Sequence, residues 1–178
     1  MVDKVVYSHW SKPMKDENVS FNSIEMMYYS FYLSVYYSRK WFKKVELVTD
    51  VAGNDLLVNR LRLPFTDVTI VLDELNYIHN DHWSIGKLLA CKIQDEPFMH
   101  QDNDVIWFKK PTKRLLKEPV FFQNYENHSH TYGYMCEHAD KNYKNKKHFI
   151  DYKNLDAVCC GVMGFNRLDF LDEFYKEA

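Results

Sequence analysis

The chain has 178 residues, a length that predicts one domain whose core is large enough to fold without a metal or a disulfide. Hydrophobic residues make up 46% of the chain and charged residues 27%, which is typical of a globular protein and excludes disordered and collagen-like chains. The 23 basic and 25 acidic side chains give a formal net charge of −2, so the chain lacks the basic excess of a general nucleic-acid binder.

The cysteines and the N-terminus together predict a cytoplasmic protein. The N-terminal MVDKVVYSHW lacks the apolar stretch of a signal peptide. No apolar run approaches the ~20 residues that span a membrane, so no transmembrane segment is expected. The cysteines include no CxxC pair and are predicted to be reduced thiols: Cys91, Cys136, Cys159 and Cys160.

The first half of the chain alternates short apolar runs with helical patterns. A helix is expected at about 22–39, where Asn22 and Glu25 have the spacing of a capping box, and a second at Asn54–Leu61. We interpret the tyrosines of the first helix as packed core. Strands are expected at Lys4–Ser8, Val45–Val48 and Val68–Leu72.

The second half continues the alternation and adds a long polar stretch. A helical face from Ile85 to Ile93 ends before Pro97. The polar, Tyr- and Lys-rich stretch at about 127–148 is expected to be a loop that closes over substrate, and Asn166 is expected to cap a last helix. Extended chain or strands are expected at Phe98–His100, Val105–Phe108, Val120–Gln123 and Ala157–Met163.

This order of elements predicts an α/β protein with a mostly parallel sheet. Ligands of such sheets bind beyond the carboxyl ends of the strands. Three polar clusters fall at expected strand ends, and we expect them to converge on one site: Ser8-His9-Trp10, Thr49-Asp50 and Asp102-Asn103-Asp104.

The Asp102-Asn103-Asp104 cluster is the strongest local signal of chemistry. Two carboxylates two residues apart repel each other, and a divalent cation removes that conflict. Their hard oxygens suit Mg²⁺ or Mn²⁺, which bind through one or two carboxylates plus substrate phosphates. An ordinary Asp/Asn turn is the alternative interpretation of the same residues.

Several features follow one another along the chain: KVVYSHW before a long helix, a strand ending in Thr49-Asp50, a helix with GKLLA, then PFMHQDNDVIW, and a late CCGVMGFNRLDF. With these features in this order, the sequence resembles glycosyltransferases of the GT-A fold. More narrowly, the W–GK helix and the H-x-D-x-D-V-x-W segment resemble an uncharacterised bacterial family related to these enzymes. The resemblance implies a three-layer α/β/α sandwich forming a single catalytic domain over 1–178. The chain is short for this class, which leaves open whether a C-terminal acceptor region is missing.

The resemblance also implies roles for individual residues. Asp104 would bind the metal directly, and Asp102 would bind the donor ribose, or the metal through water. Lys87 would approach the diphosphate or the sugar, although a solvent-facing lysine is the alternative. Residues near the nucleoside would be Val6, Tyr7, Ser8 and Asp50.

The general base is not identified by any motif. Glu126 follows an expected strand and could lie on the acceptor side, and Asp156 is the other candidate. Without a secure base, neither inversion nor retention of the anomeric configuration is predicted.

We therefore expect a metal-dependent glycosyltransferase that uses Mn²⁺ or Mg²⁺ to move a sugar from a nucleotide-diphosphate donor to a hydroxyl of a carbohydrate or glycan acceptor. A metal-dependent nucleotidyltransferase is the first alternative, but SHWSKPMKDEN after the first strand contains no glycine for a phosphate loop. The second alternative is a non-catalytic carbohydrate-binding or interaction domain of the same fold.

Overall fold

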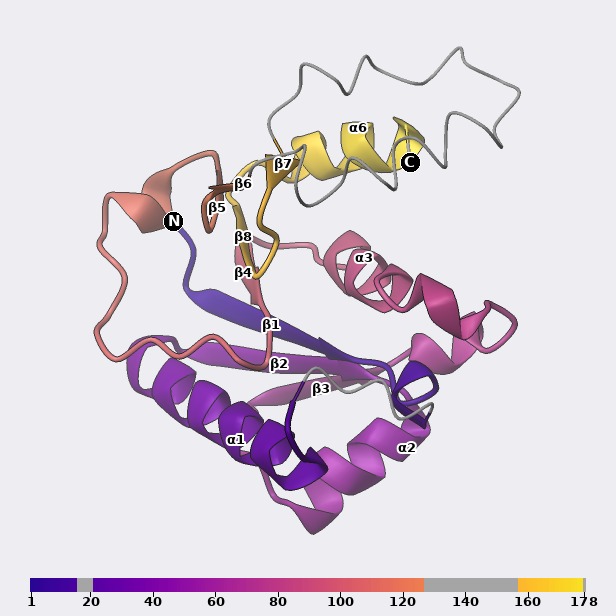
Figure 1. Cartoon of the computed structure of the whole chain (residues 1–178). Helices are drawn as coiled ribbons and strands as arrows, with labels where there is room; N and C mark the ends of the chain where they lie inside the picture. The colour runs from indigo at the N-terminus through magenta and orange to yellow at the C-terminus, as the bar shows by residue number, and fades with distance from the viewer. Residues whose placement is uncertain (16–20, 127–156, 178) are drawn as a thin grey trace.

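The computed structural model describes residues 1–15, 21–126 and 157–177 (Figure 1). The loop expected at 127–148 and the candidate base Asp156 lie outside these residues. Within the described residues, six strands form one sheet in the order β3-β2-β1-β4-β8-β5. These strands are β1 (Lys4–His9), β2 (Lys44–Thr49), β3 (Asp67–Ile70), β4 (Phe98–Gln101), β5 (Val120–Phe122) and β8 (Val162–Phe165).

The sheet is mostly parallel, as the sequence predicted. The neighbours β3, β2, β1 and β4 all run in the same direction, and β8 is antiparallel to both β4 and β5. A short separate ladder joins β6 (Tyr125–Glu126) to β7 (Ala157–Val158). The mixed α/β class is therefore confirmed.

Helices cover the sheet from two sides. Figure 1 shows α1 on one side of the sheet and α3 on the other. Within the described ranges, no helix is long and apolar enough to cross a membrane. The α-helices are α1 (Ile24–Trp41), α2 (Val51–Asn54), which continues into a π-helical segment (Asp55–Arg60), α3 (Ile85–Lys92) and α6 (Leu168–Glu177).

Strand β1 lies at the centre of the fold because both of its faces are covered. Successive side chains of a strand point to opposite faces. Val5 and Tyr7 pack with Phe31 of α1, whereas Val6 packs with Ala90 of α3. Burial on both faces explains why three consecutive residues of the strand, Val5, Val6 and Tyr7, are apolar or aromatic instead of alternating with polar residues.

The prediction of one continuous strand over Ala157–Met163 is wrong. The chain forms β7, turns at Cys159–Gly161, and only then forms β8. A Cβ on Gly161 would lie 2.4 Å from Oε1 of Gln123, so the turn needs the space that glycine leaves. The apolar run hides this turn because its residues fit a buried strand equally well.

The interpretation of the α1 tyrosines as packed core is also wrong for three of them. Tyr29, Tyr32 and Tyr36 are 68%, 44% and 42% exposed. The buried face of α1 consists instead of Met27, Phe31, Ser34, Val35 and Ser38. Small serines on this face let the helix lie close to the sheet and to the polar groups beneath it.

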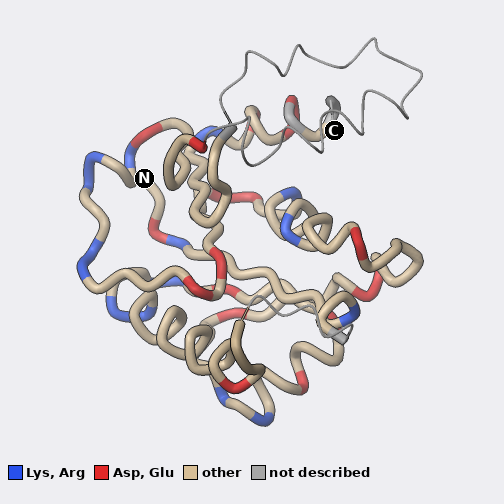
Figure 2. Tube along the Cα trace, in the orientation of Figure 1, with Lys and Arg blue, Asp and Glu red and all other residues tan. Residues whose placement is uncertain are grey.

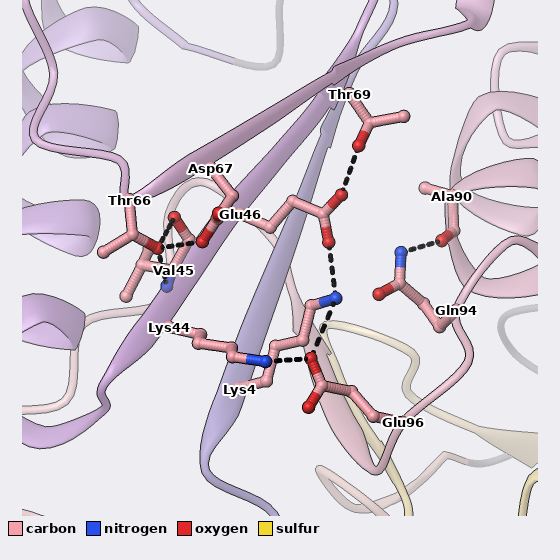
Figure 3. Close-up of polar contacts among 10 residues, drawn as sticks. All are labelled: Lys4, Lys44, Val45, Glu46, Thr66, Asp67, Thr69, Ala90, Gln94 and Glu96. Carbon is pink, nitrogen blue, oxygen red and sulfur yellow. Dashed lines mark hydrogen bonds and ion pairs between the residues drawn. The ribbon is translucent and has the colours of Figure 1, made fainter.

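A charged cluster ties the edge of the sheet at the amino ends of β1 and β2 (Figure 3). The Lys4 ammonium lies 2.8 Å from the Glu46 carboxylate, and both side chains are mostly buried, at 12% and 7% exposed. Thr69 of β3 donates a hydrogen bond of 2.5 Å to the other Glu46 oxygen. On the surface, Lys44 pairs with Glu96 at 2.6 Å.

Replacing Lys4 with methionine is expected to lower the free energy of unfolding by about 3 kcal/mol, because it leaves the Glu46 charge buried without its partner. Urea unfolding followed by circular dichroism measures this change. The control Lys44→Met removes a charge from the exposed pair and should leave stability nearly unchanged. The double variant Lys4→Met/Glu46→Leu should recover most of the loss, and a double variant as unstable as Lys4→Met would contradict the assignment.

Candidate functional site

A cavity of about 540 Å³ lies beyond the carboxyl ends of β1 and β4. Its position agrees with the general rule for ligand sites of parallel α/β sheets. The end of β1, the first residues of α3 and the segment after β4 all contribute to its wall. Residues that line it include Ser8, His9, Trp10, Met27, Asp81, Trp83, Gly86, Lys87, Asp102 and Asp104.

The register of the sheet brings these residues together. Strands β1 and β4 are parallel neighbours, with Val6 level with His100, so Ser8 near the end of β1 is level with Asp102, the residue after β4. Helix α3 approaches the end of β1 closely, since a Cβ on Gly86 would lie 3.2 Å from the Cβ of Trp10. The glycine thereby lets the next residue, Lys87, reach the acidic segment.

Lys87, which was expected to approach the diphosphate or the sugar, lies beside the acidic pair on one side of the cavity. The Lys87 ammonium lies 2.6 Å from Oδ1 of Asp102 and donates a hydrogen bond of 3.2 Å to the Cys160 carbonyl. Burial raises the pKa of Asp102, the charge of Lys87 opposes this shift, and the charge of Asp104 adds to it. Lys87 is thus no solvent-facing lysine, since its side chain is only 14% exposed.

The acidic pair supplies a donor set that fits a hard divalent cation. Asp104 is exposed, and the Lys87 ion pair engages one oxygen of Asp102. Among the described residues, no group of three or more His, Cys, Asp or Glu side chains could hold a metal ion. A cation such as Mg²⁺ or Mn²⁺ held by these two carboxylates would have to complete its coordination with water and substrate phosphates.

A buried polar network holds the acidic segment in place. The Gln101 amide nitrogen donates to the Tyr7 hydroxyl at 2.7 Å and to the Val105 carbonyl at 3.1 Å, and its oxygen accepts from the Trp107 indole at 3.0 Å. The Tyr7 hydroxyl also lies 2.9 Å from the hydroxyls of Ser34 and Ser38. Burial raises the pKa of Tyr7, so it stays a neutral phenol. These bonds tie the residues on both sides of Asp102–Asp104 to β1 and α1.

Ser8 presents a hydroxyl whose orientation is set by His100. The Ser8 Oγ lies 3.0 Å from Nε2 of His100, and Nδ1 of this histidine has no hydrogen-bond partner among the described residues. Burial and the nearby Lys87 charge lower the pKa of His100 well below its usual value, so the ring is neutral. A buried N–H without a partner is rarer than an unsatisfied acceptor, so we assign the ring hydrogen to Nε2. Ser8 then accepts from His100, and its own hydrogen can be donated into the cavity.

The other residues expected at the donor site are placed differently. The side chains of Val6 and Tyr7 are fully buried and do not line the cavity. The Asp50 carboxylate accepts hydrogen bonds from the Ser11 amide and hydroxyl, both at 2.8 Å, and from the Gly53 amide at 2.7 Å. Asp50 thus caps α2 and fixes the turn after β1, without lining the cavity.

The described candidate for the base, Glu126, lies in β6 and is not among the residues that line the cavity. Burial raises the pKa of the Cys160 thiol, the Lys87 charge opposes this rise, and the charge of Glu126 adds to it as the smallest of the causes. The carbonyl of the same Cys160 accepts from Lys87.

Several residues that line the cavity received no role from the sequence. Trp10 is 4% exposed, and the residues that the structure describes offer its indole N–H no hydrogen-bond partner. Trp83 is 63% exposed, and Asp81 contributes an exposed carboxylate. The position of Ser8-His9-Trp10 at a strand end was the available signal for Trp10, and the W–GK helix was the signal for Trp83, whereas Asp81 needed the tertiary structure.

Comparison with solved structures supports the fold. The crystal structure of mouse xyloside xylosyltransferase 1, in its apo form, is similar with a TM-score of 0.54 and 11% sequence identity, over 99% of this chain and 69% of that one. At this identity the likeness concerns the fold, and it confirms the glycosyltransferase-like α/β architecture. No curated protein sequence matches the chain. The profile of a family of unknown function, DUF6734, matches residues 3–178, and the chain therefore belongs to that family.

Proposed function

We propose that the chain is a metal-dependent glycosyltransferase that moves a sugar from a nucleotide-diphosphate donor to a hydroxyl of a carbohydrate or glycan acceptor. One observation carries the proposal: Lys87, Asp102, Asp104 and Ser8 all line one cavity at the carboxyl ends of β1 and β4. A pair of carboxylates that binds a cation, beside a lysine held in place, suits a diphosphate group. Because the fold is glycosyltransferase-like, we propose that this diphosphate belongs to a nucleotide sugar.

Asp102 and Asp104 would hold Mn²⁺ or Mg²⁺ together with the donor phosphates. When bound, such a cation acts as a Lewis acid that stabilises the departing diphosphate. Lys87 would bind a phosphate oxygen and neutralise the negative charge that develops there. Its ion pair with Asp102 keeps the ammonium at the edge of the cavity before the donor arrives.

The remaining residues would orient the donor and exclude water. Ser8 would donate a hydrogen bond to the donor, and the Trp10 side chain would form part of the wall beside it. Asp50 would act indirectly, because it fixes the turn that carries Trp10 and Ser11. Glu126 and Asp156 stay the candidates for the base that activates the acceptor hydroxyl.

We also propose that the helices on the two sides of the sheet form the three-layer α/β/α arrangement of GT-A enzymes. Packing of α1 and α3 against opposite faces of β1 supports this assignment. Residues 1–178 would then act as a single catalytic domain.

Titration calorimetry and product analysis with Mn²⁺ and a panel of nucleotide sugars test the proposal. We expect one donor to bind only in the presence of the metal and to be hydrolysed slowly without an acceptor. Release of pyrophosphate from a nucleoside triphosphate would indicate a nucleotidyltransferase instead. Sugar binding without any turnover would indicate a non-catalytic domain.

Replacing Lys87 with methionine should weaken binding of the nucleotide sugar by about 1.5–3 kcal/mol, the range for a hydrogen bond to a charged group. The stem of the side chain is retained, so affinity for the free sugar should change little. Calorimetry with donor, free nucleoside and free sugar separates these contributions.

Lys92→Met is the matched control, because Lys92 lies on the same helix and is exposed. Its donor affinity should equal that of the parent. Equal donor affinity in Lys87→Met and the parent would contradict the assignment of Lys87 to the diphosphate.

A further inference from the structure

The solvent face of α1 is apolar along most of its length. Its exposed apolar and tyrosine side chains are Ile24, Met26, Tyr29, Tyr32, Leu33 and Tyr36, with exposures between 40% and 68%. Glu25 is the only acidic residue of the helix and lies in its first turn. Contiguous exposed apolar surface of this kind marks an interaction site on a protein.

The aromatic rings on this face are arranged in contact with one another. The rings of Tyr32 and Tyr36 stack with centroids 6.2 Å apart, and Tyr37 meets Phe108, which is 70% exposed, at 5.3 Å. The Lys40 ammonium lies 4.5 Å and 4.6 Å from the ring centroids of Tyr36 and Tyr37. The apolar face thus continues from α1 onto the segment after β4, and a cation lies directly on it.

A basic rim adjoins this aromatic face. Helix α1 ends in Arg39 and Lys40, and the Trp41 indole donates to the Trp107 carbonyl at 2.8 Å, which joins the helix to the chain before Lys109. Residues 105–117 contain no acidic residue. Figure 2 shows that Lys and Arg gather along this segment on the side of the molecule where α1 ends. The exposed basic residues of the segment are Lys109, Lys110, Lys113, Arg114 and Lys117.

We propose that this aromatic and basic surface binds the headgroup region of an anionic lipid bilayer. Tyrosine rings place an apolar body in the interface and a hydroxyl in water, which suits the boundary of a membrane. Clustered lysines and arginines gain about fivefold in binding for each charge near an anionic leaflet. The whole chain has a net charge of −2, yet basic residues are concentrated in this rim. The rim is therefore complementary in charge to an anionic membrane surface.

Other occupants fit these features less well. A second copy of the chain would bring the same basic rims together and would repel itself. Single-stranded nucleic acid needs ring faces open for stacking, but Tyr32 and Tyr36 already stack on each other. The membrane proposal does not depend on the proposed transferase activity, because no residue of this surface is assigned to the donor site.

Vesicle sedimentation of the full chain tests the proposal. The chain should bind vesicles of phosphatidylcholine with about one-third phosphatidylserine, and should not bind phosphatidylcholine alone. Binding should be lost in about 1 M salt, where the Debye length is about 3 Å. Lys109→Ala/Lys110→Ala should lower partitioning about 25-fold, and Tyr29→Ala/Tyr32→Ala about tenfold, because less ring area leaves water.

The controls are an exposed tyrosine and an exposed lysine away from this surface. Tyr77→Ala and Lys92→Ala should each bind the anionic vesicles as the parent does, and circular dichroism should report an unchanged fold for all variants. No binding to anionic vesicles at low salt would overturn the proposal, as would binding that the tyrosine variant leaves unchanged. A dimer in sedimentation velocity that Tyr29→Ala/Tyr32→Ala dissociates, or binding of a short RNA without vesicle binding, would reassign the surface.

Discussion

Replacing Asp104 with asparagine is expected to lower Mn²⁺-dependent sugar transfer at least a hundredfold while the protein stays folded. The Asp104 carboxylate is one of two that would hold the cation. Lewis-acid stabilisation of the leaving group lowers the activation free energy by several kcal/mol. Each 1.36 kcal/mol of this free energy changes the rate by about a factor of ten. Asp104 is exposed, and Lys87 forms its ion pair with Asp102. The charge of Asp104 can therefore be removed without breaking that ion pair. Initial rates at saturating donor, with and without chelator, measure the effect.

The matched control is Asp172→Asn, which removes an exposed carboxylate from α6. Its rate should equal that of the parent, and both variants should unfold at the parental urea concentration. Metal-dependent transfer at the parental rate in Asp104→Asn would remove the acidic pair from the donor site. The fold assignment would survive that result, since it depends on the sheet and its core.

Lowering the pH from 6.5 to 5 should reduce the free energy of unfolding by about 2 kcal/mol for each of two buried histidines. Burial lowers the pKa of His9 to about 4, against an opposing effect of Asp50, and lowers that of His100 still more clearly. Both folded pKa values lie below the unfolded value, so the unfolded chain takes up protons first as the pH falls. The contribution of the two neutral histidines to the free energy of unfolding is therefore fully present above pH ~6.5 and is lost as the pH falls toward 4.

Urea unfolding at several pH values measures this slope. His100→Leu should remove about half of the expected loss, whereas His82→Asn, at an exposed histidine, should leave the slope unchanged. Asp102 acts in the opposite direction, because its raised pKa makes the folded protein bind its proton first. A parental stability that does not change between pH 7 and 5 would contradict the assignment of neutral buried histidines.

The order of strands and helices could be predicted from the sequence because local patterns encode it. The apolar runs of β1, β2 and β4 and the periodicities of α1 and α3 are visible within windows of ten to twenty residues or fewer. The α1 cap shows the limit of such patterns, since Ser23, one residue after the expected Asn22, accepts from the Met26 amide.

The acidic pair and Lys87 could also be predicted, since residue type and position after a strand or before a helix are local properties. The expected convergence of the acidic pair with Ser8 and with Thr49-Asp50 followed from one topological rule, that parallel strands present their carboxyl ends at one edge. The acidic pair and Ser8 do line one cavity, which Lys87 also lines, but Thr49 and Asp50 do not line it. Their chemistry stays a prediction.

Only the tertiary structure decided which of the remaining polar and aromatic residues are available to a ligand. Asp50 and Tyr7 both carry a polar group that could contact a ligand, but packing commits Asp50 to Ser11 and buries Tyr7 beneath α1. The tyrosines of α1 divide in the same way, because the tilt of the helix on the sheet sets which face is covered. Contacts between segments distant in sequence determine burial, and no local pattern carries that information.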